Sequence, residues 1–329
     1  MKTGGESVRT VLVALSANVA VGIAKAIAGL LSGSAALLAE AAHSVADVGT
    51  EILLLTALRR SDRPADRKHP FGYGKERYFW SLLAAVSIFT AGALFSLYQG
   101  VSTLVSGRAE QHSATAAYLV IAVGMVLEGI SLMRAIRQVR GERLREGLGL
   151  RSWLRLTDDP TVKTILFEDS AAICGLLLAL FGVLLSHLTG SPRWDGAAAL
   201  AIGLLLVAAA YGLGRTNLVL LTGRQADPRL VRNIADCLRR QPEVDSLVDL
   251  LTMLVGTDRV LVCARVDIVD GLGSAEVEGA CVRIAATLRE EYSDVDEVFL
   301  EPVPSADPEL RARVLERYGR TLSETRGSD

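Results

Sequence analysis

The chain has 329 residues, of which 50% are hydrophobic and 22% charged, and its formal net charge is −2. Its mean hydropathy is +0.34, so charged and apolar residues must be sorted into separate blocks. The stretches 78–107, 171–192 and 196–214 contain no Asp, Glu, Lys or Arg, and each is about long enough to cross a hydrocarbon core of ~30 Å. This excludes a soluble globule, a disordered chain and a secreted disulfide scaffold. The near-neutral charge also argues against nucleic acid as a partner.

Six apolar segments are predicted to cross the bilayer as helices. They cover residues 8–31, 34–58, 78–105, 114–138, 161–188 and 195–213. Only Ser32 to Ser34 separate the first two segments, which predicts a tight hairpin. Few residues precede the first segment and they contain no small-residue cleavage site, so we expect a retained helix and not a signal peptide.

Basic residues predict the orientation of these segments. The loops after the second and fourth segments are rich in Lys and Arg, whereas the opposite loops hold only Arg108 and Arg193. Because basic loops remain in the cytosol, both termini are predicted to be cytosolic. The four cysteines form no CxxC pair and are interpreted as free thiols.

The apolar period changes after residue 222. Residues 228–238 have helical spacing, whereas residues 260–268 alternate as a strand. With an apolar run at 247–255, a helix at 274–291 and a strand at 295–300, the order is α-β-β-α-β. The predicted organisation is thus a transmembrane domain (1–222), a small α+β cytosolic domain (223–304) and a polar, frayed C-terminal tail (305–329).

The second segment retains four ionisable side chains: Glu40, His43, Asp47 and Glu51. At 100° per residue they fall within an arc of about 80° and extend over about 16 Å of the helix axis. Ionisable groups are costly inside a membrane and therefore indicate function. His43 and Asp47, one turn apart, are predicted to bind one metal ion.

Other segments must supply the remaining ligands. The fifth offers Glu168 and Asp169, and the fourth offers Glu128. Adjacent helical residues point about 100° apart, so Glu168 and Asp169 are not expected to face one centre squarely. One His with two or three carboxylates favours Zn²⁺, with Mn²⁺, Co²⁺ and Fe²⁺ as alternatives. The predicted metal ligands are His43, Asp47 and Asp169, with Glu168 and Glu128 as further candidates.

Four other polar residues are candidates for supporting or pathway roles. Lys25 either neutralises a carboxylate or takes part in transport, and Asn18 either supports a ligand or joins helices by a hydrogen bond. Glu40 is expected at the outer mouth, and Glu51 lies on the pathway toward the cytosol. For Glu128, ligation or proton carriage and interhelical hydrogen bonding both remain open.

At these residues the sequence resembles the cation diffusion facilitator family over nearly its whole length. The resemblance is carried by Asn18 and Lys25, by the run 33–47 that holds His43 and Asp47, by His-Pro-Phe-Gly-Tyr-Gly at 69–74 and by Trp-Asp-Gly at 194–196. Glu-Gly-Ile-Ser at 128–131 and Phe-Glu-Asp-Ser at 167–170 resemble the mitochondrial zinc-transporter branch and its bacterial relatives.

The resemblance implies a homodimer of six-helix protomers in the lipid bilayer of a bacterial inner membrane, with a metallochaperone-like cytosolic domain. It implies efflux of a divalent cation, usually Zn²⁺, by proton antiport through alternating access, with no cofactor and no enzymatic activity. Because metal ligands must be deprotonated and imidazole titrates near neutral pH, His43 is suited to exchange metal for protons.

The sequence departs from the family pattern at two places. In the fifth segment, Ile165 occupies a position where the family pattern has a metal ligand. Glu168, about 60° away around the helix, is the candidate replacement. No His follows His187, so we expect no strong binuclear site in the cytosolic domain, where Asp249, Asp267, Glu276 and the cysteines are the remaining candidates. His69 is expected in a turn or packing role, and His112 and His187 in loops.

Three alternatives remain open at this stage. Gly92, Ser96 and Gly100 form a small-residue ridge that would serve a dimer contact or packing within one protomer. An intramembrane metalloprotease is disfavoured because HExxH is absent. A non-transporting metal-sensing scaffold would account for Ile165.

Overall fold

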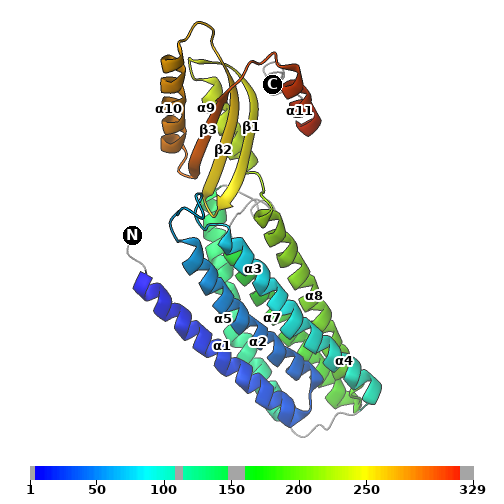
Figure 1. Cartoon of the computed structure of the whole chain (residues 1–329). Helices are drawn as coiled ribbons and strands as arrows, with labels where there is room; N and C mark the ends of the chain where they lie inside the picture. Colours follow the sequence, from blue (N-terminus) through cyan, green and yellow to red (C-terminus); the bar gives the residue numbers. More distant parts are fainter. Residues whose placement is uncertain (1–3, 108–113, 147–159, 319–329) are drawn as a thin grey trace. The chain divides into compact units, whose positions relative to one another are not determined.

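The computed structural model describes residues 4–107, 114–146 and 160–318. The chain divides into two compact units: the first comprises Met1–Arg63 and Glu76–Leu218, and the second comprises Pro64–Lys75 and Val219–Asp329. The second unit is therefore discontinuous, because it includes the loop between two helices of the first (Figure 1).

Long helices make up the first unit. They are α1 (Gly4–Ser32), α2 (Ala35–Ser61), α3 (Glu76–Ser87), the π-helix η1 (Ile88–Ala93), α4 (Leu94–Ser106), α5 (Ala114–Glu146), α7 (Pro160–Thr189) and α8 (Arg193–Leu221). Five helical spans are long and apolar enough to cross a membrane, and α1 adds the shorter apolar stretch Asn18–Ser32. The expected polytopic helical class is confirmed, with five to six apolar helices for the six spans predicted, and α3, η1 and α4 together form one span.

The α1–α2 turn and the start of α8 meet at one end of this bundle, which we call the hairpin end. The α1–α2 turn has Gly33 at φ 67°, a conformation that suits glycine, and Ser34 caps α2 by accepting a hydrogen bond from the Leu37 N–H at 3.1 Å. Asp195 of α8 accepts hydrogen bonds from the Ser34 hydroxyl at 2.7 Å and from the Ala35 N–H. We call the opposite end, where α2 finishes in Arg59 and Arg60, the basic end.

The small-residue ridge packs inside the protomer. A Cβ at Gly100 would lie 2.6 Å from the Leu200 N of α8, and one at Gly92 would lie 3.1 Å from Leu206. Ser96 is fully buried and donates a hydrogen bond to the Gly92 carbonyl at 2.7 Å. Of the two interpretations of the ridge, packing within one chain is therefore the one observed.

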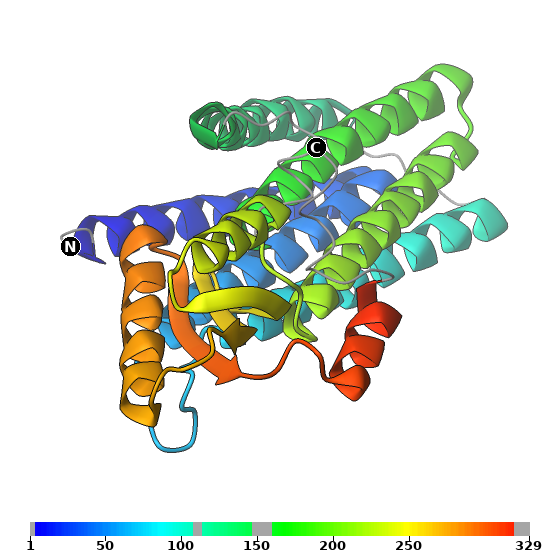
Figure 2. The ribbon, with the colours of Figure 1, turned by 90° about the horizontal axis from the view of Figure 1, so that it is seen from above.

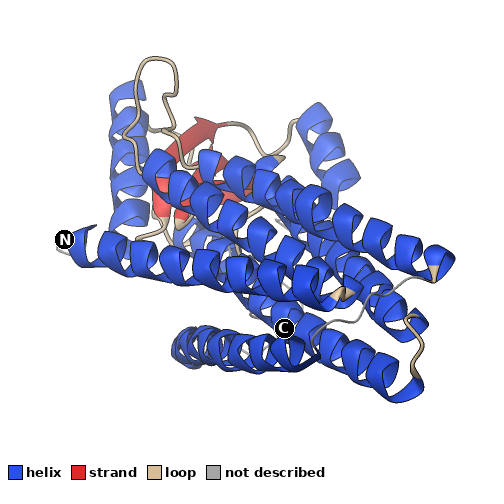
Figure 3. Ribbon diagram, turned by 90° about the horizontal axis from the view of Figure 1, so that it is seen from below, coloured by secondary structure: helices blue, strands red, loops and turns tan. Residues whose placement is uncertain are grey.

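The second unit contains a three-stranded sheet. Its elements are α9 (Pro228–Arg239), β1 (Val244–Gly256), β2 (Arg259–Ile268), α10 (Ser274–Glu291), β3 (Val295–Pro302) and α11 (Pro308–Tyr318). The strand order is β1-β2-β3, with β2 antiparallel to β1 and parallel to β3. Helix α9 packs on β1 and α10 on β3 (Figure 2), and in the described residues all strands belong to this unit (Figure 3). The predicted α-β-β-α-β order is confirmed.

Two local predictions are wrong. Residues 308–318 of the expected frayed tail form α11, because Asp307 accepts hydrogen bonds from two N–H groups of its first turn and Val314 is buried. His187 lies in the last turn of α7 instead of a loop, with its Nδ1 3.4 Å from the Tyr118 hydroxyl. His112 and residues 319–329 lie outside the described residues.

The loop 64–75 has a defined fold within the second unit. The Asp66 carboxylate accepts hydrogen bonds from the Tyr73 hydroxyl at 2.7 Å and from the backbone N–H groups of Lys68 and His69 at 2.8 Å. These bonds, the Tyr73 bond first, lower the pKa of Asp66. The His69 ring packs on Tyr73 with centroids 4.2 Å apart, so His69 stabilises the turn.

Candidate metal site

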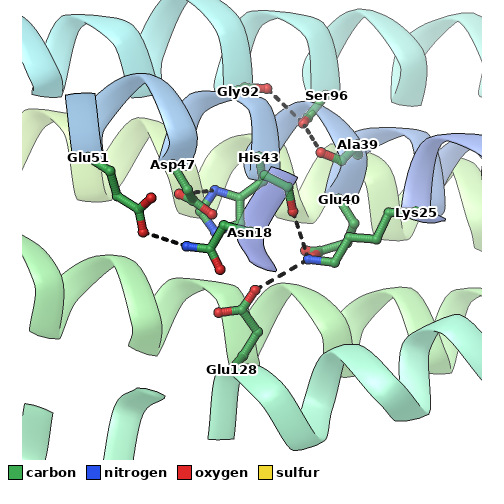
Figure 4. Close-up of polar contacts among 11 residues, drawn as sticks. Asn18, Lys25, Ala39, Glu40, His43, Asp47, Glu51, Gly92, Ser96 and Glu128 are labelled. Carbon is green, nitrogen blue, oxygen red and sulfur yellow. Dashed lines mark hydrogen bonds and ion pairs between the residues drawn. The ribbon is translucent and has the colours of Figure 1, made fainter. Parts of the chain in front are cut away.

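The four ionisable side chains of the second segment lie along α2 in the interior of the first unit (Figure 4). Glu40 and His43 are fully buried, while Asp47 and Glu51 are partly buried. An alanine-rich first half of α2 favours the helix and lets neighbouring helices approach closely. The predicted helical stripe is thus present in the interior of the bundle.

A cavity of about 260 Å³ opens beside this stripe. Its lining residues are Asn18 of α1, Asp47, Glu51, Leu54, Leu55 and Leu58 of α2, Glu128 and Ser131 of α5, and Ile165, Glu168, Asp169 and Ala172 of α7. Five carboxylates from three helices therefore share one cavity. Glu168 and Asp169, which were not expected to face one centre squarely, both line it.

Polar contacts fix several of these side chains. The His43 Nδ1 lies 3.4 Å from the Asp47 Oδ1, Asn18 donates to the Glu51 Oε1 at 2.5 Å, and the Ser131 hydroxyl donates to Asp169 at 2.8 Å. Asn18 thus makes the interhelical hydrogen bond that was one of its two predicted roles.

Several buried ligand atoms have no protein partner. Among the described residues, the His43 Nε2, the Glu51 Oε2 and the Glu168 Oε1 accept or donate no hydrogen bond. Burying a polar atom without a partner is costly. A cation in the cavity would satisfy the Glu51 and Glu168 atoms, since both side chains line it, which is the physical argument for a metal site here.

The candidate ligands are gathered but do not form a closed coordination sphere. Within the described ranges, no three His, Cys, Asp or Glu side chains are close enough to hold one ion. Asp47, Glu128, Glu168 and Asp169 border the cavity, whereas His43 lies one turn beyond Asp47 and does not line it. Binding one ion with His43 would therefore require the helices to move closer.

Lys25 and Glu40 form a separate buried contact. The Lys25 Nζ lies 3.2 Å from the Glu40 Oε2, 3.0 Å from the Ser44 Oγ and 3.6 Å from the Glu128 Oε1. Lys25 therefore neutralises carboxylates. The expectation that Glu40 lies at the outer mouth is wrong, because its carboxylate is fully buried against this ammonium group.

In the second unit the remaining candidate acids make structural ion pairs and hydrogen bonds. Asp249 is buried and pairs with Arg265 at 3.3 Å and Arg317 at 3.0 Å. Asp267 accepts a hydrogen bond from the Ser305 N–H, and Glu276 accepts one from the Gly273 N–H. The cysteines are free thiols, and burial raises the pKa of Cys237.

Two residues of the site were missed from the sequence. Ser131 lies three residues after Glu128, on the same helical face, so its spacing was a usable signal. Gly175 borders the Glu40 carboxylate closely, and a single glycine in an apolar helix gives no such signal.

Comparisons with known proteins agree with this architecture. Residues 11–222 match the model of the cation efflux transmembrane domain. Metal tolerance protein C4 of Arabidopsis thaliana is 32% identical over 91% of this chain and 63% of its own length. The mitochondrial proton-coupled zinc antiporter SLC30A9 of Xenopus laevis is 32% identical over 98% of this chain and 55% of its own length. The chain thus spans less than two thirds of the length of these two relatives.

A bacterial relative is similar in length. Magnetosome protein MamB of Paramagnetospirillum magneticum is 28% identical over 89% of this chain and 93% of its own length.

Proposed function

The chain belongs to the cation efflux family, and we propose that it exports Zn²⁺ across a membrane in exchange for protons. The observation that carries the proposal is the cavity inside the bundle, which five carboxylates line and beside which His43 lies with an unpartnered Nε2. The printed name of the Xenopus relative, a proton-coupled zinc antiporter, supports the same cation and the same coupling. Binding and release of an ion account for these groups without an enzymatic reaction.

The proposed cycle uses these side chains in turn. A cation enters from the basic end and binds Asp47 and Asp169, with Glu128 and Glu168 as further ligands. His43 completes the site as the helices close. Because metal binds only deprotonated ligands, protons arriving from the other side displace it. Glu168 supplies the carboxylate that Ile165 lacks.

The proposed surroundings follow from charge and family. The basic end faces the cytosol, because Arg59 and Arg60 end α2 there. A homodimer in a bacterial inner membrane is the proposed assembly.

The proposal is tested by zinc flux into proteoliposomes under an imposed pH gradient. We expect Asp47→Ala to lower the initial rate at least about tenfold, since it removes a carboxylate ligand. Asp62→Ala is the matched control: Asp62 is exposed at the C-terminal end of the same helix and should leave the rate unchanged. Equal rates of zinc flux in Asp47→Ala and the unsubstituted protein would contradict the proposal that zinc is transported through this site.

The same assay separates the alternatives. Saturable zinc binding without flux would support a metal-sensing scaffold in place of a transporter. Faster flux of Mn²⁺, Fe²⁺ or Co²⁺ than of Zn²⁺ would make that ion the transported cation. Glu168→Gln is expected to lose flux, while Ile165→Asp in that background restores part of it.

A further inference from the structure

The cavity ends before the hairpin end of the bundle, and a buried polar cluster lies beyond it. This Lys25 cluster consists of Lys25, Glu40 and Ser44. Four helices each carry one residue that lines the cavity and another that belongs to the Lys25 cluster or contacts it. On each helix the second residue lies nearer the hairpin end than the first. The pairs, lining residue first, are Asn18 and Lys25 on α1, Asp47 and Glu40 on α2, Glu128 and Gly124 on α5, and Ala172 and Gly175 on α7.

The Lys25 cluster is closed to solvent. Lys25 and Glu40 are both 0% exposed, and the ammonium donates to Glu40 at 3.2 Å and to Ser44 at 3.0 Å. None of the three residues lines the cavity. An ion leaving the cavity toward the hairpin end therefore meets this ion pair first.

Glycines on the neighbouring helices fit the cluster closely. A Cβ at Gly175 would lie 2.1 Å from the Glu40 Oε1, one at Gly22 3.3 Å from the Ser44 Cβ, and one at Gly124 3.6 Å from the Lys25 Cε. The α7 backbone thus approaches the carboxylate more closely than any side chain would permit. The ion pair fills the space between these helices.

Stability alone is a weak reason for such a pair. The desolvation cost of two buried charges commonly offsets their attraction, and well-packed apolar residues would serve equally well. Glu128 supplies another reason: it lines the cavity and its Oε1 also lies 3.6 Å from the Lys25 Nζ. Among the described residues, it is the cavity-lining side chain in ion-pair contact with the cluster (Figure 4).

We propose that the Lys25–Glu40 ion pair is the gate that closes the cavity toward the hairpin end, and that Glu128 links this gate to the bound cation. The inference rests on the proposed transport function. A divalent cation in the cavity attracts Glu128 away from Lys25, which weakens the hold on the ammonium group and releases the gate. Lys25 and Glu40 are thus positioning residues that do not touch the transported ion.

The gate is tested by thiol labelling, which does not depend on transport. In a chain with its native cysteines replaced, Ala172→Cys places a thiol on the cavity wall, and a membrane-impermeant reagent is applied from the hairpin side of proteoliposomes. We expect slow labelling in this background. Adding Lys25→Met with Glu40→Gln, which removes both charges of the pair, should raise the rate about tenfold or more by populating the open form.

Three further measurements make the test specific. The double variant should pass zinc without a pH gradient, as an ungated pathway does. Glu128→Gln should lose coupled flux and raise labelling less than the double variant does, since it removes one contact of the ammonium group while the Lys25–Glu40 pair remains. Lys163→Met is the matched control: Lys163 is also a buried lysine, but it lies near the other end of α7, so its labelling rate should not change.

Labelling of the double variant at the background rate, without a zinc leak, would show that the pair only packs the bundle and would overturn the gate. If the double variant does not fold, Gly175→Ala displaces the Glu40 carboxylate while keeping both charges, and it should raise labelling in the same way; an unchanged rate would again overturn the gate. If the unsubstituted protein moves no zinc while labelling responds as expected, the proposed function fails and the gate stands.

Discussion

Asp195 joins two helices that are far apart in the sequence. Its carboxylate, on α8, accepts hydrogen bonds from the Ser34 hydroxyl and from two backbone N–H groups in the first turn of α2. The first N–H groups of a helix have no partner within the helix, and a carboxylate there also interacts favourably with the helix dipole. The Asp of the Trp-Asp-Gly run therefore has a structural role, because it holds the start of the helix that carries His43 and Asp47.

We expect Asp195→Asn to lower the free energy of unfolding in detergent by about 2 kcal/mol, because it removes charge-assisted hydrogen bonds from a buried position. Ser34→Ala removes one of these bonds and the cap, and should cost about 1 kcal/mol. Denaturant unfolding followed by circular dichroism measures both. Equal stability of Asp195→Asn and the unsubstituted protein would show that the carboxylate does not stabilise α2.

At this scale, the sequence predicted the stripe on α2 because helical geometry alone aligns Glu40, His43, Asp47 and Glu51. It did not predict which groups pair across helices. The contact of Lys25 with Glu128 and the space left by Gly175 depend on how helices pack, which a single helical period does not encode.

At the scale of elements, the loop 64–75 packs on the end of β1 and on β3. A Cβ at Gly74 would lie 2.5 Å from the Val255 carbonyl oxygen, and Phe71 meets Phe299 edge to face at 6.5 Å. Gly74 of the His-Pro-Phe-Gly-Tyr-Gly motif is thus explained by close backbone contact, whereas Gly72 has a φ of 75°, which favours glycine.

We expect Gly74→Ala to destabilise the second unit by about 1–3 kcal/mol, because backbone atoms must shift to admit the methyl group. Gly279→Ala is the matched control in the same unit: its Cβ meets only the mobile end of Arg283, and alanine in a helix should stabilise by up to about 1 kcal/mol. Thermal unfolding monitored by tyrosine fluorescence distinguishes them; equal melting temperatures would contradict the close contact.

Elements were predictable where burial repeats regularly. The long apolar runs predicted the long helices, and the alternation of apolar and polar residues predicted β2. The π-helix η1 was missed because its six residues have the composition of ordinary helix. Helix α11 was missed because its sequence is polar; the buried Val314, the Asp307 cap and the ion pair of Arg317 with Asp249 hold it in place.

At the scale of the whole molecule, the second unit takes its parts from two places in the chain. Removing residues 223–329 would therefore leave the loop 64–75 without Val255 and Phe299, the residues on which it packs.

We expect trypsin to cut after Arg67 or Lys68 about tenfold faster in a chain ending at Thr222 than in the full chain, because cleavage follows the population of the open loop. Cleavage after Arg193, at the hairpin end, is the internal reference and should not change. Equal loop cleavage in both chains would mean that the loop keeps its fold unaided.

The insertion of this loop also has a mechanical consequence. The chain passes between the two units three times, at Arg63/Pro64, Lys75/Glu76 and Leu218/Val219. A domain joined by a single linker can rotate freely. A domain joined at three points of the chain exerts a force on each connection when it rotates. Any rotation of the second unit therefore applies a load directly to the end of α2, the helix that carries His43 and Asp47.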